Sequence, residues 1–143
     1  MRKLRNKTQS PKRPFDAARI EAEKALLREY GLRRKHEIRV AEAVLRRFRK
    51  RARDLIAVAD KEKERVLLQK LAKLGILSEK ATLDDVLALT VNDILNRRLQ
   101  TIVFKKGLAN TPKHARQLIV HGHVRVNGRR IKYPSYIVPV HEE

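Results

Sequence analysis

Residues 97–138 constrain the fold of this chain more than any other stretch of its sequence. Polar and apolar residues alternate strictly over 123–126, and Asn127-Gly128 follows immediately. Both turn residues tolerate the positive φ angles that a two-residue hairpin connection requires. We therefore predict a small β-hairpin whose return strand starts at Arg129.

Two short amphipathic helices are predicted just before this hairpin. Apolar residues of the first recur at three- and four-residue steps, as on one helix face, at Leu95, Leu99, Ile102 and Val103. We expect Gly107 to end this helix, because glycine adopts the left-handed conformation of a helix C-terminus at little cost. Thr111-Pro112 is typical of the start of the next helix, which Gly122 would end. The shared apolar interior would consist of Ala115, Leu118, Ile119, Val124, Val126 and Ile131.

The rest of the chain is predicted to be helical. Longer helices are expected over 14–30, 34–59 and 61–74, and shorter ones are expected to start at Thr82 and Thr90. Each of these threonines has an acid three residues later, which is typical of a capping box. The helix from Thr90 would run on into residues 97–103. Packing residues are expected at Phe15, Ile20 and Tyr30, then along the seam Ile38, Ala41, Leu45, Phe48, Ala52, Leu55 and Ala59, then at Val66, Leu67, Leu68, Leu71 and Leu74.

Positive charge is concentrated in two blocks. The formal net charge is +19. Residues 1–53 contain 19 Lys and Arg against 6 Asp and Glu, and residues 94–143 contain 10 Lys and Arg against 2 Asp and Glu. The intervening residues 54–93 carry 6 against 8. Surface charge that serves solubility alone would mix the two signs more evenly. Two cationic blocks on a small protein indicate a large polyanionic partner.

Other classes of function find little support in the sequence. The chain has no cysteine, so disulfides, thiolate metal sites and thiol nucleophiles are excluded. No apolar run approaches the length of a membrane span, and the basic start at Met1 lacks the apolar segment of a signal peptide, so we expect a cytoplasmic protein without a membrane partner. His121 and His123 have no carboxylate or cysteine nearby. We therefore expect no metal, no cofactor and no catalytic residues.

The C-terminal residues resemble a known family. The sequence GLANTPKHARQLIVHGHVRVNGRRI, followed by PSYIV, is similar to the S4 RNA-binding module, named after a small-subunit ribosomal protein. The segment LAKLGILSEKATLDDVLALTVNDILNRRLQTIVFKKGLA extends the resemblance to the ribosomal S4 family in its archaeal and eukaryotic form. Members often continue past PSYIV, whereas this sequence stops at Glu143, so contacts of a C-terminal tail are not expected.

The resemblance and the sequence patterns together imply a mostly helical α+β fold. We expect a basic arm (residues 1–13), a helical subdomain that binds rRNA (residues 14–93), and a C-terminal module of two helices and a β-hairpin set against it (residues 94–143). The family's RNA-binding positions correspond to Arg97, Arg98, Lys105, Lys106, Thr111, Lys113, Arg116, Gln117, His121, His123 and Arg125. The charge blocks add Arg129, Arg130, Lys132, Arg46, Arg47, Arg49, Lys50, Arg51, Arg53, Arg2, Lys3, Arg5 and Lys7.

The function that the resemblance implies is structural. We expect a constituent of the small ribosomal subunit that binds the 5′ domain of its rRNA at a multi-helix junction and nucleates assembly. The expected neighbours are ribosomal proteins S3 and S5, with mRNA at the channel by which it enters. The alternatives are an RNA-modification or RNA quality-control factor that uses the same module, and a protein that binds DNA or anionic membranes, since basic helices allow either.

Overall fold

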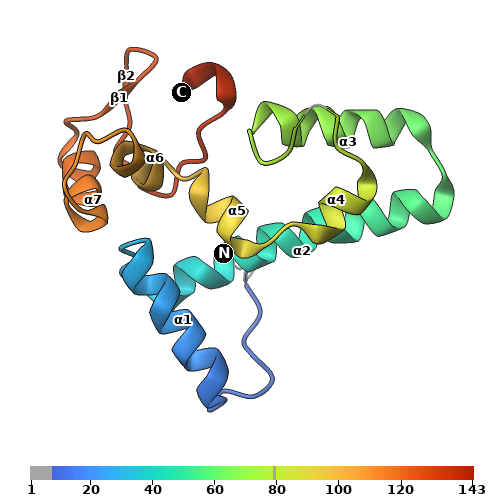
Figure 1. Cartoon of the computed structure of the whole chain (residues 1–143), viewed down its shortest axis with the longest axis horizontal. Coiled ribbons are helices and arrows are strands. Elements are labelled where there is room, and N and C mark those ends of the chain that lie inside the picture. Colours follow the sequence, from blue (N-terminus) through green and yellow to red (C-terminus); the bar gives the residue numbers. More distant parts are fainter. Residues whose placement is uncertain (1–7, 79) are drawn as a thin grey trace, which may run out of the picture.

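Helix α2 (Lys35–Val58) is the element against which the other helices of the N-terminal part are packed. The computed structural model describes residues 8–78 and 80–143. In it, α2 runs through the middle of an elongated molecule and contacts α1, α3, α4 and α5 (Figure 1). The apolar seam predicted for this helix explains these contacts, because Ile38, Ala41, Leu45 and Ala52 are all buried. Ala59, which we expected to continue the seam, is exposed and ends the helix in the left-handed conformation.

The other helices of the first core begin at residues that cap them. They are α1 (Ala17–Glu29), α3 (Lys61–Lys73), α4 (Leu83–Ala88) and α5 (Val91–Asn96). The side chains of Asp16 and Asp60 accept hydrogen bonds from the backbone of α1 and α3. Thr82 and Thr90 form the capping boxes that the sequence predicts, with backbone-to-carboxylate distances of 2.7 Å.

The prediction of one continuous helix face from Leu95 to Val103 is wrong. Helix α5 ends at Asn96, and α6 (Leu99–Lys105) starts three residues later. Between them, Arg98 forms an antiparallel bridge with Ile137 near the C-terminus. The backbone N–H of Leu99 donates to the carbonyl of Tyr136 (2.7 Å), and that of Val138 donates to Arg97 (3.0 Å). These pairings satisfy backbone groups that a continuous helix would have bonded internally.

The C-terminal module has the expected composition of two helices and a hairpin. It contains α6, α7 (Pro112–His121), β1 (Arg125–Val126), β2 (Arg129–Arg130) and a final 3₁₀ turn η1 (Val140–Glu142). Thr111 caps α7, and Gly122 ends it with φ 80°. Asn127 and Gly128 have φ angles of 49° and 77°, as a primed hairpin turn requires. The predicted hairpin is therefore confirmed.

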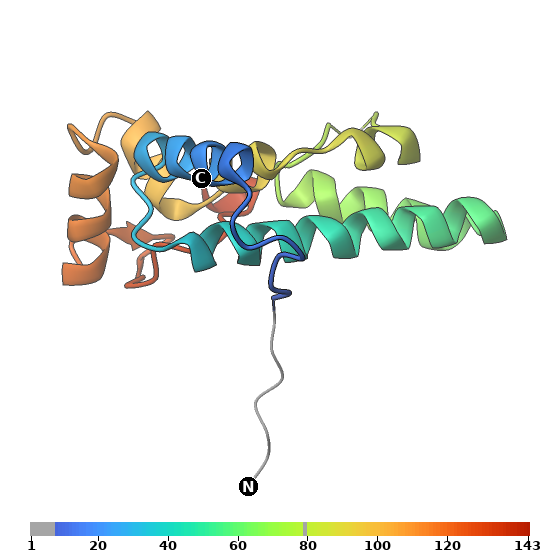
Figure 2. The same ribbon diagram turned by 90° about the horizontal axis from the view of Figure 1, so that it is seen from below.

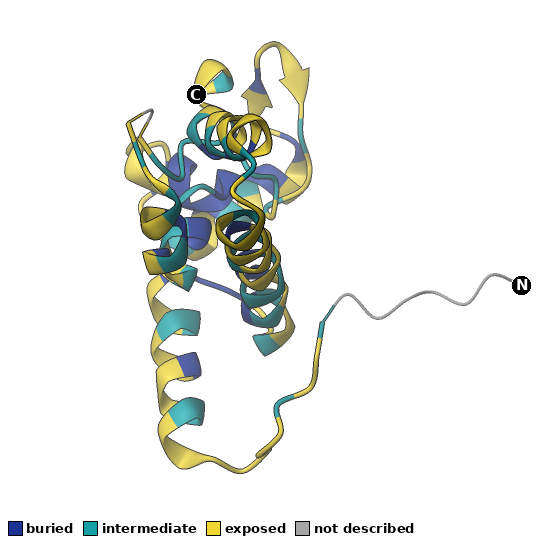
Figure 3. Ribbon diagram, turned by 90° about the vertical axis from the view of Figure 1, so that its right-hand side faces the viewer, coloured by how far each residue is buried: buried dark blue, intermediate teal, exposed yellow. Residues whose placement is uncertain are grey.

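Two apolar cores lie on either side of the break at residues 97–98. The first contains Leu95 and the seam of α2, and the second contains Leu99, Val103, Ala115, Ile119, Val126 and Val138. Figure 2 shows α2 running from beside the C-terminal module to the far end of the helical part, and Figure 3 shows the buried segments along the inside of the helices. Besides Ala59, two expected packing residues are exposed: Phe15 (92%) precedes α1, which starts at Ala17, and Val66 (65%) faces away from the core.

The fold agrees with the predicted class, a mostly helical α+β protein with one small hairpin. Among the described residues, no helix is both long enough and apolar enough to cross a membrane.

Candidate nucleic-acid interface

Helix α2 presents a stripe of cations on the side away from its seam. Arg46, Lys50 and Arg53 recur at four- and three-residue steps, so they share one exposed face. Arg47 and Arg51 are exposed beside them, whereas Arg49 is half-buried and donates to the carbonyl of Leu89. Within residues 8–78 and 80–143, none of the six α2 cations named in the sequence analysis forms an ion pair. Their charge is therefore available to an external anion.

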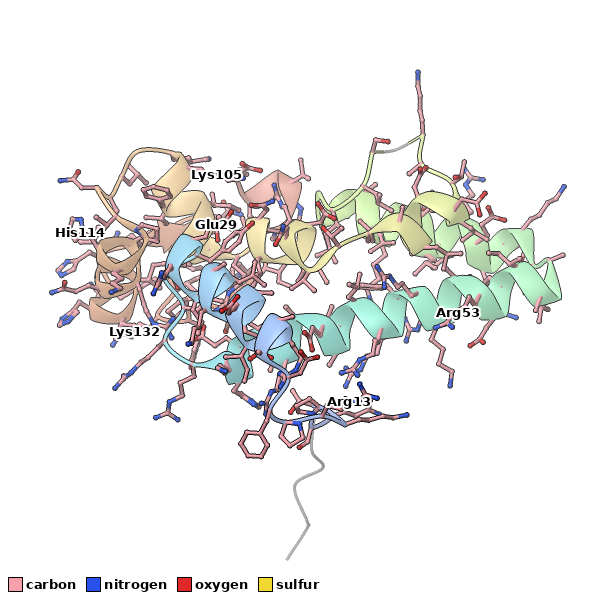
Figure 4. All side chains as sticks on the ribbon, turned by 60° about the horizontal axis from the view of Figure 1, so that its bottom comes forward. Arg13, Glu29, Arg53, Lys105, His114 and Lys132 are labelled. Atoms are coloured by element: carbon pink, nitrogen blue, oxygen red, sulfur yellow. The ribbon has the colours of Figure 1, made fainter. Side chains whose placement is uncertain are left out.

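The basic arm lies against this stripe where the structure describes it. Arg46 donates to the side-chain oxygen of Gln9 at 2.9 Å, although the two residues are far apart in the sequence. Figure 4 shows Arg13 and Arg53 along the same edge of the molecule. The expected contacts of Arg2, Lys3, Arg5 and Lys7 lie outside the described residues.

The C-terminal module presents a second cationic surface. Lys113, Gln117 and His121 are exposed on one face of α7, while Ala115 and Ile119 are fully buried on the other. The predicted division of this helix into two faces is thus confirmed. In the hairpin, Arg125 pairs with Arg130 across the strands, and both are exposed. Two like charges directly opposite each other are unfavourable unless an anion lies close to them.

The remaining predicted residues of the module lie around this surface. His123, Arg129 and Lys132 are exposed. Lys105 and Lys106 are exposed at the end of α6, and Thr111 is used as the cap of α7. In Figure 4, Lys132 lies on the same edge as Arg13 and Arg53, whereas Lys105 lies on the opposite edge.

Three of the predicted RNA-binding arginines contact carboxylates of the protein. Arg98 is only 5% exposed, and its guanidinium contacts the carboxylate of Glu37 at 2.6 Å. Arg116 contacts the same carboxylate at 3.1 Å. Arg97 contacts Glu143 at 2.9 Å and donates to the carbonyl of Val138 at 2.7 Å. Arg98 and Arg116 share the single carboxylate of Glu37, so this group of three side chains keeps a net positive charge, and the RNA contacts of the three arginines stay predictions.

Glu37 joins the helical subdomain to the C-terminal module. It lies in the first turn of α2 and also accepts a hydrogen bond from the backbone N–H of Arg33 at 3.0 Å. Burial raises the pKa of Glu37, but the hydrogen bonds from Arg116, Arg98 and Arg33 outweigh it and lower the pKa to about 2. The carboxylate is therefore ionised at any physiological pH and holds both arginines of the module.

Gln100 forms a second junction between the two parts. Its side chain is almost fully buried, and its amide nitrogen donates to the carbonyls of Tyr30 (3.1 Å), Gly31 (3.1 Å) and Pro112 (2.9 Å). One side chain of α6 thus fixes both the turn after α1 and the start of α7. Because buried carbonyls need a donor, this contact restricts the two cationic surfaces to one relative arrangement.

A cleft lies at this junction, with a volume of about 440 Å³. It is lined by Arg33, Arg34, His36, Glu37, Val40, Arg98, Arg116, Pro134 and Ser135. Arg33 and Arg34 were not predicted as part of the site, although both are exposed here. The sequence does contain an indication of their role: two consecutive cations stand at the start of a helix, where the helix dipole disfavours positive charge unless an anion lies nearby. These residues extend the cationic surface from α2 to the module.

Among the described residues, no three His, Cys, Asp or Glu side chains gather in a group that could hold a metal ion. The acids near residues 82–93 serve as helix caps, as predicted.

Comparison with known proteins identifies the family. The S4 domain family matches residues 97–143. Small ribosomal subunit protein uS4 of Ignicoccus hospitalis is 54% identical over 146 residues, which cover 99% of this chain and 87% of that protein. Proteins of the same name from Saccharolobus islandicus and Saccharolobus solfataricus are 53% and 51% identical, with 99% of this chain and 81% of each relative covered. The chain belongs to the uS4 family.

Membership of the uS4 family confirms the resemblance that the sequence indicated. The match to the S4 domain starts at Arg97, at the break between α5 and α6, and so includes the whole second core. The uS4 relatives carry the name of a ribosomal subunit protein and not of an enzyme, in agreement with the expected absence of a catalytic role.

Proposed function

We propose that this chain is a structural component of the small ribosomal subunit that holds rRNA between two cationic surfaces. The first surface is the α2 stripe, Arg46, Lys50 and Arg53, and the second is the exposed face of α7 with the hairpin. The observation that carries the proposal is the lack of carboxylate partners for these cations among the described residues, while Arg97, Arg98 and Arg116 are paired. Phosphates would complete the charge balance.

The proposed mechanism is organisation of RNA rather than chemistry. Glu37 and Gln100 fix the two surfaces relative to each other, so RNA segments bound to both would be held in one arrangement. Binding at two surfaces of one body raises the effective concentration of the second contact, so the intact chain should bind much more tightly than either surface alone. The cationic cleft at the junction would receive the phosphates that lie between them.

The family resemblance supports a more specific RNA target and specific neighbours. We propose the 5′ domain of small-subunit rRNA as the target, at a junction of several helices, with binding early in assembly. Ribosomal proteins S3 and S5 would be neighbours, close to the channel by which mRNA enters. These placements rest on the family resemblance.

A salt titration tests the proposal directly. If roughly 6–10 phosphates are neutralised, affinity for an rRNA 5′-domain transcript should fall by about a thousandfold or more between 50 and 200 mM salt. The triple variant Arg46→Gln/Lys50→Gln/Arg53→Gln should weaken binding and reduce the salt slope by about 3, since each phosphate contact contributes about 1.

The matched control removes cations from another helix. Lys70 and Lys73 are exposed on α3, outside both surfaces. The variant Lys70→Gln/Lys73→Gln should keep the wild-type slope. Equal losses in the two variants would mean that net charge alone drives binding, and an unchanged slope in the triple variant would exclude α2 from the interface.

A further inference from the structure

His121 and His123 form an aromatic pair at the edge of the module. Their ring centroids are 6.3 Å apart, and the ring planes differ by only 12°. Both residues are exposed, and neither ring contacts an aromatic side chain other than its partner among the described residues. Because the planes are nearly parallel, one planar group can lie parallel to both imidazoles. This is the geometry that aromatic stacking requires.

Backbone geometry fixes this arrangement. Gly122, between the two histidines, ends α7 with φ 80°, so the chain turns there instead of continuing the helix. The N–H of His123 then donates to the carbonyl of Leu118 at 2.9 Å, which locks the turn. His121 is therefore the last residue of α7, and His123 projects from the turn that this hydrogen bond closes.

Two cations lie against the same glycine. Gly122 is buried although both neighbours are exposed, because the side chains of Arg130 and Lys132 lie over it. A Cβ atom on Gly122 would be 3.0 Å from the Arg130 side chain and 3.3 Å from that of Lys132. Neither cation forms an ion pair within the described residues. The site thus combines two exposed rings with two basic side chains whose aliphatic parts lie over Gly122.

We infer that His121, His123, Arg130 and Lys132 bind one unpaired nucleotide, with its base stacked on the imidazoles and its phosphate between the two cations. This inference rests on the proposed rRNA-binding function and adds a contact to a single-stranded base. Histidine is among the side chains on which unstacked RNA bases are held. The chain has few other aromatic residues, three Tyr, three Phe and no Trp, so a histidine pair would supply this contact here.

The test measures how tightly two double variants of the full chain bind an rRNA 5′-domain transcript. His121→Phe/His123→Phe keeps both aromatic faces and removes hydrogen bonding, whereas His121→Gln/His123→Gln keeps hydrogen bonding and removes the faces. Stacking predicts that the Phe variant binds within about twofold of wild type and that the Gln variant binds roughly fivefold to a hundredfold more weakly. Chemical probing should show one unpaired nucleotide protected by wild type and the Phe variant but not by the Gln variant.

His114→Gln serves as the control, because His114 is exposed on the same helix but has no ring partner (Figure 4). It should bind like wild type. Equal binding by the Phe and Gln variants, or weaker binding by the Phe variant, would overturn the stacking site. If circular dichroism shows that a double variant is unfolded, the single variants His123→Phe and His123→Gln are compared in the same way. Wild-type protein that fails to bind the transcript would contradict the proposed function itself, which is a separate result.

Discussion

Replacement of Glu37 by glutamine should destabilise the fold strongly. The variant keeps the shape of the side chain but removes the charge that pairs with Arg98 and Arg116. The pKa of Glu37 is lowered from 4.5 to about 2, a difference of about 2.5 pH units. At about 1.4 kcal/mol per unit, the ionised carboxylate contributes about 3 kcal/mol to the free energy of unfolding. The Glu37 side chain is only 17% exposed, so solvent screens this contribution little.

The pH dependence provides a second, independent check. Because the folded-state pKa of Glu37 lies below its ordinary value, the contribution is fully present above pH 4.5 and is lost as pH falls towards 2. Urea denaturation followed by circular dichroism should therefore show a difference between wild type and Glu37→Gln of about 3 kcal/mol at pH 7. That difference should shrink between pH 4.5 and 3.

The control is Glu42→Gln, on the same helix. Glu42 is half-buried and forms no ion pair within the described residues, so its replacement should change stability by about 0.5 kcal/mol or less. A loss below about 1 kcal/mol for Glu37→Gln at pH 7, or a difference that does not shrink on acidification, would refute the role of Glu37 as the ionic link between the two parts.

Two further changes should test how the helical subdomain meets the module. Gly31→Ala should cost at least about 1 kcal/mol more than Gly107→Ala in urea denaturation, because both glycines have positive φ, but only at Gly31 would a Cβ lie 2.7 Å from Pro112. Similar losses for the two variants would mean that the contact with Pro112 relaxes freely. Gln100→Glu should cost about 3 kcal/mol or more, since a buried carboxylate would face three carbonyl oxygens that now accept hydrogen bonds. The exposed Gln117→Glu is its control and should leave the midpoint nearly unchanged.

Local sequence determined most of the elements of this protein. The hairpin turn at Asn127-Gly128, the capping boxes at Thr82 and Thr90, and the end of α7 at Gly122 all depend on residues within four positions of one another. Such interactions are encoded by side-chain type and spacing, so they can be predicted without knowledge of the fold. The seam of α2 was predictable for the same reason, because its period follows from helix geometry.

Charge counting likewise predicted a polyanionic partner, but it could not tell which cations already contact a carboxylate of the protein. Arg116 lies next to the exposed face of α7, and helix geometry alone places it beside Lys113 and Gln117. The structure brings Glu37, from a distant helix, against it. A long-range ion pair leaves no periodic signal in the sequence, so only the tertiary structure separates cations that contact a carboxylate of the protein from those that have no such partner among the described residues.

Tertiary structure also decided where the chain divides. Leu95 and Leu99 fit one helix face by spacing, yet they belong to different cores. The break between them exists because residues 136–138 pair with the backbone at 97–99, and this pairing depends on the chain returning from the hairpin. The spacing of apolar residues in a helix reflects only contacts between neighbouring turns of that helix. Backbone pairing with a segment some 40 residues away can outweigh the preference for a continuous helix. It satisfies the same backbone hydrogen-bonding groups, and it buries the second core as well.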